Sequence, residues 1–207
     1  MFIKICGITN LEDARMSVAA GADALGFNFY RPSPRYIDPH SAREIIEQLP
    51  DSVLTVGVFV NEESPAVVEQ IASEARVTAL QLHGDETPEY CRELANRYVI
   101  KVLSAGNDFK PEDALDYDVQ AIMLDAFDSK LRGGTGRTID WSRARQTRDL
   151  VSKLILAGGL APENVGEAIA TVSPYGVDAC SALERIPGKK IPERVTSFIN
   201  AARAASK

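Results

Sequence analysis

The sequence predicts a closed barrel of eight parallel strands, each followed by a helix, formed as a single domain by residues 1–207. Short apolar runs alternate with amphipathic stretches along the whole chain, as in parallel sheets with helical crossovers. The runs are almost continuously apolar, which is typical of strands buried on both faces. An open, doubly wound sheet is the alternative, but no Gly-x-Gly-x-x-Gly follows the first strand.

The first four units each join an apolar run to a stretch with helical periodicity. The strands are expected at residues 2–6, 24–29, 54–60 and 79–83. The first helix is expected from about Leu11, with Thr9 or Asn10 as its cap and Gly21 as its stop. Further helices are expected over residues 41–49, over residues 65–75 and after Thr87.

The last four units repeat this order. The strands are expected at residues 99–103, 121–125, 153–157 and 176–180. A short helical piece is expected near Pro111, and longer helices are expected near Asp140, after Pro162 and near Pro192.

Composition narrows the possible partners and environment. The formal net charge is −6, and an acidic protein of this kind is not expected to attract nucleic acid or an anionic membrane. No apolar run approaches the roughly 20 residues that span a bilayer. Three cysteines without regular spacing do not make a disulfide framework. We therefore expect a cytoplasmic protein that binds neither nucleic acid nor membranes, and a monomer, since no interface stripe stands out.

Polar residues at the predicted strand ends indicate where chemistry occurs, because barrels of this kind place their sites there. Cys6 ends the first strand and Asp125 ends the sixth, so the two would face each other across the barrel mouth. Proton-transfer groups on opposite sides of a substrate suit an isomerase. The alternatives are a small packed side chain for Cys6 and a helix or turn cap for Asp125.

Strand alternation predicts an ion pair inside the barrel. If Cys6 points into the mouth, Lys4 and Phe2 point inward as well. A buried lysine needs a partner. Asp178 on the eighth strand, which neighbours the first strand in a closed barrel, is the candidate. Lys4 would then also lower the pKa of Cys6.

Glycine-rich segments after the sixth and seventh strands indicate a phosphate group on the substrate. Backbone N–H groups approach an anion closely where no Cβ intervenes, and the last loops of such barrels often bind phosphate. The residues expected to bind the substrate at this side are Asp178, Gly134, Gly136, Gly158, Gly159 and Ser181. Turn formation is the alternative role for the glycines.

Arg35 is a candidate for binding a carboxylate. Pro32 and Pro34 stiffen its loop, and a guanidinium binds a carboxylate through two parallel hydrogen bonds. A solvated surface arginine is the alternative.

Nine segments carry a resemblance to a known family. They are KICGIT (4–9), GFNF (26–29), SPRY (33–36), VGVFVN (56–61), LQLHGDE (80–86), LDA (124–126), GGTG (133–136), LAGGL (156–160) and GVD (176–178). In this order, and over nearly the whole chain, they resemble the phosphoribosylanthranilate isomerase family of tryptophan biosynthesis.

The resemblance implies an Amadori rearrangement without a cofactor. N-(5′-phosphoribosyl)anthranilate would become 1-(2-carboxyphenylamino)-1-deoxyribulose 5-phosphate. By the resemblance, Cys6 is the general base, Asp125 is the general acid and Arg35 binds the anthranilate carboxylate.

The chain departs from the family pattern after the eighth strand. Where the family usually has Ser-Ser-Gly-Val-Glu, residues 180–184 read Cys-Ser-Ala-Leu-Glu, and Ile191 stands where an aspartate is expected. Ala182 adds a Cβ where backbone should meet phosphate, so either the loop tolerates it or phosphate binds more weakly.

Other readings differ in what they require. Indole-3-glycerol-phosphate synthase would want an extension before the first strand. A ribulose-phosphate epimerase would want metal-binding histidines, whereas His40 and His83 are the two histidines present and no cluster has ligand spacing. A barrel kept as a phosphate sensor or scaffold would not need both Cys6 and Asp125.

Overall fold

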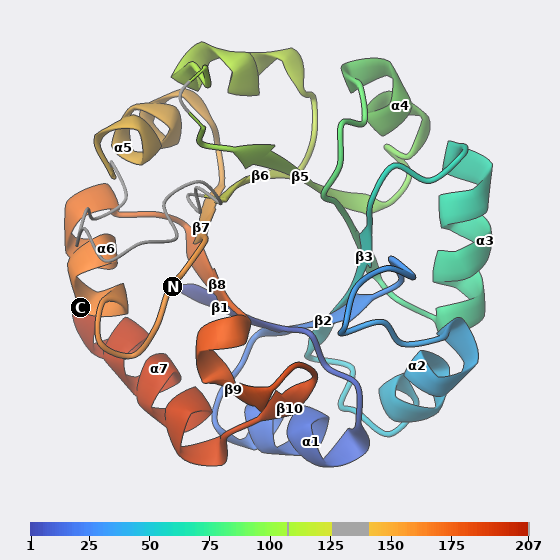
Figure 1. The fold of residues 1–207 in the computed structure, drawn as a ribbon. Coiled ribbons are helices and arrows are strands. Elements are labelled where there is room, and N and C mark those ends of the chain that lie inside the picture. Colours follow the sequence, from blue (N-terminus) through green and yellow to red (C-terminus); the bar gives the residue numbers. More distant parts are fainter. Residues whose placement is uncertain (107, 126–140, 207) are drawn as a thin grey trace.

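The computed structural model describes residues 1–106, 108–125 and 141–206. Eight strands close into a barrel in sequence order, and each neighbouring pair is parallel. Helices surround the barrel, and the first and last strands lie side by side (Figure 1). The predicted fold class is confirmed.

The barrel strands carry the labels of Figure 1. They are β1 (Phe2–Cys6), β2 (Ala24–Asn28), β3 (Leu54–Phe59), β4 (Ala79–Leu82), β5 (Tyr98–Ser104), β6 (Ala121–Asp125), β7 (Leu154–Ala157) and β8 (Gly176–Ala179). The predicted strands 24–29, 54–60, 79–83 and 176–180 each end one residue too late, because the chain leaves the ladder there to enter a loop. The fifth is longer by one residue at each end, and the seventh starts one residue later than predicted.

The α-helices alternate with the strands. They are α1 (Leu11–Ala19), α2 (Pro39–Ile46), α3 (Pro65–Ala75), α4 (Pro88–Glu93), α5 (Trp141–Leu150), α6 (Val165–Val172) and α7 (Pro192–Ala205). The cap of α1 is Asn10, whose side chain accepts a hydrogen bond from the backbone of Asp13. The helix predicted over residues 41–49 starts earlier, because Asp38 caps it and Pro39 occupies its first turn. In the part of the chain that the structure describes, no helix is long and apolar enough to cross a membrane.

Short elements between β8 and α7 were not predicted. They are the 3-10 helix η3 (Ser181–Leu183) and the antiparallel strands β9 (Glu184–Ile186) and β10 (Lys189–Lys190). Elements of two or three residues are too short to produce a hydrophobic period in the sequence. The 3-10 helix η1 (Pro111–Asp116) corresponds to the helical piece expected near Pro111.

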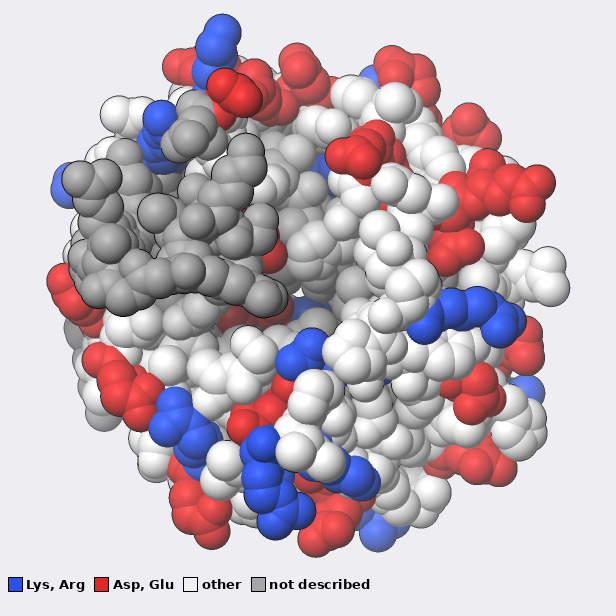
Figure 2. Space-filling model, in the orientation of Figure 1, with Lys and Arg blue, Asp and Glu red and all other residues white. Residues whose placement is uncertain are grey.

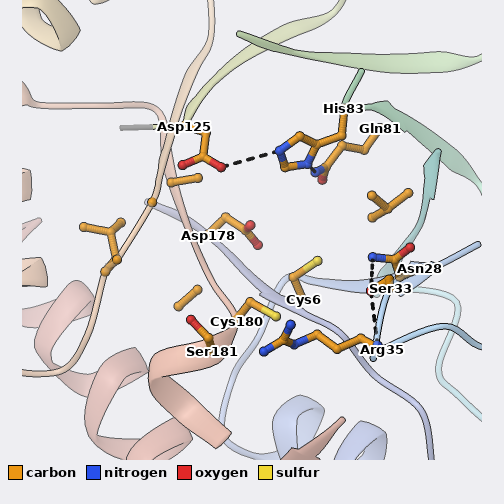
Figure 3. A pocket seen from close by; sticks show the side chains of 16 residues that line it. Cys6, Asn28, Ser33, Arg35, Gln81, His83, Asp125, Asp178, Cys180 and Ser181 are labelled. Atoms are coloured by element: carbon orange, nitrogen blue, oxygen red, sulfur yellow. Dashed lines mark hydrogen bonds and ion pairs between the residues drawn. The ribbon is translucent and has the colours of Figure 1, made fainter. Parts of the chain in front are cut away.

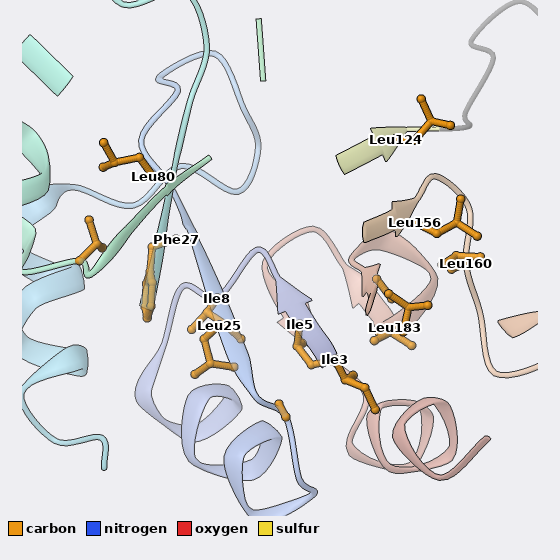
Figure 4. Close-up of a cluster of buried hydrophobic side chains, with 14 of the residues drawn as sticks. Ile3, Ile5, Ile8, Leu25, Phe27, Leu80, Leu124, Leu156, Leu160 and Leu183 are labelled. Atoms are coloured by element: carbon orange, nitrogen blue, oxygen red, sulfur yellow. The ribbon is translucent and has the colours of Figure 1, made fainter. Parts of the chain in front are cut away.

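Apolar side chains form two layers, one on each side of the barrel wall. The inner layer consists of Ala24, Val56, Ala79, Ile100, Val102, Ala121, Met123, Ile155 and Ala157. The outer layer lies between the strands and the helices, and Ile3 and Ile5 belong to it (Figure 4). Because side chains alternate along a strand, Phe2, Lys4 and Cys6 face the interior, as predicted.

A buried ion pair joins β5 to the loop after β4. Lys101 Nζ lies 2.7 Å from Glu86 Oε2, and both side chains are almost fully buried. Lys101 also donates to the carbonyl of Gly84, and Glu86 accepts from the backbone N–H groups of Gly84 and Asn61. This network fixes the loops after β3 and β4 at the open end of the barrel.

Replacing Lys101 with methionine is expected to destabilise the protein strongly. The substitution leaves the Glu86 carboxylate buried without its cation, which costs about 3–5 kcal/mol. The matched control is Arg43→Met, which breaks the exposed pair with Glu47 and should cost no more than about 1 kcal/mol. Urea unfolding measures both, and equal losses for the two variants would contradict the importance of the buried pair.

Candidate active site

A cavity opens at the carboxyl ends of the strands, at the place predicted from the strand-end residues. Its volume is about 270 Å³, and Figure 2 shows a hollow at the centre of this face of the barrel. Cys6 and Asp125 both line it from different sides (Figure 3). The other polar lining residues are Asn28, Ser33, Arg35, Gln81, His83, Asp178, Cys180 and Ser181.

Cys6 is the last residue of β1, and a glycine beside it makes room for its side chain. Its register partner on β2 is Gly26. A Cβ at Gly26 would lie 2.7 Å from Cys6 Sγ and 3.1 Å from Lys4 Nζ. Any larger residue would therefore displace the thiol, the ammonium group or both.

The surroundings of Cys6 favour the thiolate. A hydrogen bond from the Cys180 thiol contributes most to lowering the pKa of Cys6 well below its ordinary value. Burial opposes this shift, whereas the charges of Lys4 and Lys190 add to it. The same hydrogen bond and burial raise the pKa of Cys180. Of the two thiols, Cys6 is therefore the one that ionises.

The predicted ion pair between Lys4 and Asp178 is present below Cys6. Lys4 Nζ donates to Asp178 Oδ1 at 2.9 Å, and Lys4 is fully buried. Burial opposes the charge on Lys4, but the Asp178 and Cys6 anions raise its pKa above the ordinary value. Burial raises the pKa of Asp178 to about 6, with Lys4 acting against that shift. Both groups are therefore charged at neutral pH.

Asp125 ends β6 on the other side of the cavity and is held by a histidine. His83 Nε2 lies 3.4 Å from Asp125 Oδ2. The other ring nitrogen, Nδ1, lies 3.0 Å from Gln81 Nε2. If the Gln81 amide donates to Nδ1, the ring proton is on Nε2 and points at Asp125. His83 thus lies between Gln81 and Asp125 and supports the Asp125 carboxylate.

Arg35 reaches the cavity from the loop after β2. Its backbone N–H donates to Ser33 Oγ at 3.1 Å. Its side chain binds Glu184 through Nε, at 3.0 and 2.9 Å from the two carboxylate oxygens, and through Nη2, at 2.6 Å. Glu184 therefore fixes the guanidinium and raises its pKa. Among the described residues no partner hydrogen-bonds to Nη1, which can therefore meet a ligand.

Two residues that hold the site, Glu184 and Lys190, were not predicted from the sequence. Lys190 Nζ is buried and donates to Glu184 Oε1 at 2.9 Å and to the carbonyls of Cys6 and Cys180. These residues lie on β9 and β10. Because no strand was predicted there, the sequence did not show that these two charged side chains belong to the site. Their placement depends on contacts between Cys6 and Lys190 that are distant in sequence.

The side of the cavity near β7 and β8 contains Gly158, Gly159 and Ser181, three of the residues predicted to bind phosphate. Gly158 and Gly159 have φ angles of 90° and 68°, a left-handed conformation that suits glycine. A Cβ at Gly159 would meet no atom within 4 Å, which leaves the approach to its backbone open. Ser181 lines the cavity as well. Gly134 and Gly136 lie outside the described residues.

Ala182, at the departure from the family pattern, has a structural contact of its own. Its carbonyl accepts a hydrogen bond from Arg194 Nε at 2.6 Å. It is not among the residues that line the cavity. Among the described residues, no cluster of three or more His, Cys, Asp or Glu side chains is arranged to hold a metal ion.

The comparisons with known proteins show the family of this chain. The family model described as N-(5′-phosphoribosyl)anthranilate (PRA) isomerase matches residues 3–201. The chain belongs to this family. The isomerase of Thermotoga maritima is 48% identical, over 97% of this chain and 98% of its own. That of Trichlorobacter lovleyi is 46% identical, over 98% of each chain.

Solved structures of PRA isomerases have the same fold. The crystal structure from Thermotoga maritima has a TM-score of 0.91 and 47% identity, covering 99% of each chain. Another, in complex with reduced 1-(o-carboxyphenylamino)-1-deoxyribulose 5-phosphate, has a TM-score of 0.89 and 46% identity with the same coverage. This chain is thus a PRA isomerase family member by both sequence and fold.

Alkylation of Cys6 is expected to reveal its lowered pKa. Iodoacetamide reacts with the thiolate, so the pH midpoint of its reaction at Cys6 should lie well below that of an ordinary thiol. Lys4→Met should move the midpoint to higher pH, because the thiolate then loses a neighbouring cation. Mass spectrometry of the Cys6 peptide measures the rate.

The control is Lys153→Met, since Lys153 lies over the rings of Tyr98 and Tyr175, near the starts of β5 and β8. It should leave the midpoint unchanged. An equal shift in both lysine variants, or none in either, would contradict the assigned role of Lys4.

Proposed function

We propose that this protein converts N-(5′-phosphoribosyl)anthranilate into 1-(2-carboxyphenylamino)-1-deoxyribulose 5-phosphate by general acid–base catalysis. The supporting observation is the placement of Cys6 and Asp125 on different sides of one cavity in a PRA isomerase barrel. The reaction moves hydrogen within one molecule and leaves its overall oxidation state unchanged. It therefore needs no external oxidant or reductant, and we propose that it proceeds without a cofactor.

The acid form of Asp125 starts the reaction in this proposal. It donates a proton to the ring oxygen of the ribose, and the C1′–O bond breaks as the anthranilate nitrogen forms a Schiff base. Asp125 is left as a carboxylate. The nearby Nε2–H of His83, 3.4 Å away, stabilises that negative charge.

Cys6 completes the isomerisation as the base. Its thiolate removes the proton from C2′, and the electron pair of that C–H bond neutralises the iminium to give an enolamine. The enolamine then tautomerises to the ketone. Holding Cys6 ionised before substrate binds is the task of the Cys180 thiol, Lys4 and Lys190, because a base must be unprotonated to act.

The remaining polar groups account for the two anionic ends of the substrate. Arg35, held by Glu184, donates from Nη1 to the anthranilate carboxylate. Backbone and hydroxyl donors of Gly158, Gly159 and Ser181 bind the phosphate. Asp178, on the same side of the cavity, contacts the sugar of the substrate. Gly134 and Gly136 are proposed to complete the phosphate site.

We also propose a cytoplasmic monomer that acts on a substrate with a single phosphate. The three cysteines are unpaired, which suits a reducing compartment. A solved Thermotoga maritima relative is described as monomers generated from a dimeric isomerase, so size-exclusion chromatography of this protein tests the monomer directly. The related aminoaldose of histidine biosynthesis carries two phosphates. The sequence predicts one phosphate-binding region, which favours the substrate with a single phosphate.

Cys6→Ala and Asp125→Asn are each expected to lower kcat by about 10²–10⁴-fold, since each removes one proton-transfer group. Loss of anthranilate fluorescence measures the reaction. Cys91→Ala is the control, because Cys91 is buried in α4 and does not line the cavity. Wild-type turnover at background level would refute the function, and a fully active Cys6→Ala variant would refute the base.

Arg35→Lys is expected to raise KM by about tenfold, with a smaller change in kcat. Lysine keeps the charge but loses the planar group that can bind Glu184 and a carboxylate at the same time. The control is Arg43→Lys, because the Arg43 side chain is exposed on α2. An unchanged KM in Arg35→Lys would remove the carboxylate contact from the proposal.

A further inference from the structure

We propose that Cys6 and Cys180 form a thiol pair that peroxide oxidises reversibly to a disulfide. The Cys180 thiol helps to keep Cys6 ionised for the isomerisation, and this proposal gives the same sulfur a second role. Formation of the disulfide does not depend on the proposed function. Only its consequence rests on that function, namely that the disulfide removes the catalytic base and stops the isomerisation.

The fold places the two cysteines at the ends of neighbouring strands, since Cys6 is the last residue of β1 and Cys180 directly follows β8. Ile5 of β1 pairs with Ala179 of β8, and Cys6 and Cys180 are the next residues along each chain. Adjacent strands lie about 4.8 Å apart. Disulfides need a Cα–Cα distance of about 4.4–6.8 Å, so the two backbones run within bridging range.

Contacts beyond the strand ends keep the pair together. Lys190 Nζ donates to the carbonyl oxygens of both Cys6 and Cys180. A Cβ at Gly7, the residue after Cys6, would lie 2.9 Å from Cys180 Sγ. The Cys180 side chain therefore lies over the end of β1, and both sulfur atoms face the cavity (Figure 3).

The two thiols differ in the way that oxidation requires. The Cys180 thiol, Lys4 and Lys190 favour the thiolate form of Cys6, and the thiolate is the form that attacks peroxide. The cavity gives a small oxidant access to it. Cys180 remains protonated beside it and is placed to resolve the oxidised sulfur.

The chemistry balances with hydrogen peroxide as the oxidant. The Cys6 thiolate attacks one peroxide oxygen, the O–O bond breaks, and Cys6 sulfenic acid and hydroxide form. The Cys180 sulfur then attacks Cys6 Sγ, the S–O bond breaks, and water leaves with the Cys180 proton. The hydroxide takes up the proton that Cys6 released on ionising, so in total two thiols and one peroxide give one disulfide and two waters. Dithiothreitol reverses the bond by thiol exchange.

The test compares wild type with Cys180→Ser after brief exposure to peroxide. The wild type should lose about 2 Da and two alkylatable thiols, with peptide mapping joining Cys6 to Cys180. Cys180→Ser lacks the resolving sulfur, so Cys6 should gain about 32 Da as sulfinic acid, which dithiothreitol does not reduce. Cys180→Ala serves as a second variant if the serine fails to fold.

Cys91→Ser is the matched control. Cys91 is buried in α4, and burial raises its pKa to about 11, so this variant should form the same bond as the wild type. Oxygen addition in place of hydrogen loss in the wild type would overturn the proposal. So would a disulfide that includes Cys91, or full recovery of peroxide-treated Cys180→Ser by dithiothreitol.

Activity is compared with the reduced form of each variant. Wild-type turnover should fall by at least about 100-fold on oxidation and return with dithiothreitol, whereas the loss in Cys180→Ser should persist. Because mass and thiol count report the bond without any substrate, an absent isomerase activity would refute the proposed function alone. Unchanged activity in fully disulfide-bonded protein would refute the inhibition.

Discussion

The ion pair between Lys4 and Asp178 connects the closure of the barrel to its chemistry. The two residues are register partners on β1 and β8, although 174 positions separate them in the chain. Two charges persist in such a buried place only when each compensates the other. The pairing of the first and last strands supplies that compensation, and it also fixes an ammonium group beneath Cys6. The same contact therefore stabilises the seam of the barrel and the thiolate.

A second group of charges fixes the upper end of this seam. Lys190 of β10 donates hydrogen bonds to the carbonyl oxygens of Cys6 and Cys180, at the ends of β1 and β8. Glu184 of β9 forms ion pairs with both Lys190 and Arg35. The short hairpin thus connects three separate segments around Cys6. Because Glu184 is buried between two cations, they hold its pKa below the ordinary value although burial opposes this. The position of Arg35 in the cavity depends on that carboxylate.

Sequence periodicity was sufficient to predict the repeated strand–helix units. It predicted the eight strands and, through alternation on β1, the inward direction of Lys4 and its partner Asp178. It failed for Glu184 and Lys190, because elements of two or three residues carry no period and their contacts are set by the closed barrel. Strand ends were misplaced by one residue for a related reason. The apolar run continues into the loop, and only the hydrogen-bonded ladder shows where pairing stops.

The two sides of the cavity differ in a way that follows from their tasks. Cys6 lies in buried, cation-rich surroundings that keep it ionised, whereas Asp125 is partly exposed and contacts a histidine that can stabilise its charged form after proton donation. Keeping a thiolate ready beside an open cavity has a chemical cost, since the thiolate that removes a carbon-bound proton also attacks peroxide. A thiol at position 180 limits that cost, because a disulfide can be reduced again and a sulfinic acid cannot be reduced by simple thiols. The electrostatics that activate Cys6 thus also make a neighbouring resolving thiol useful.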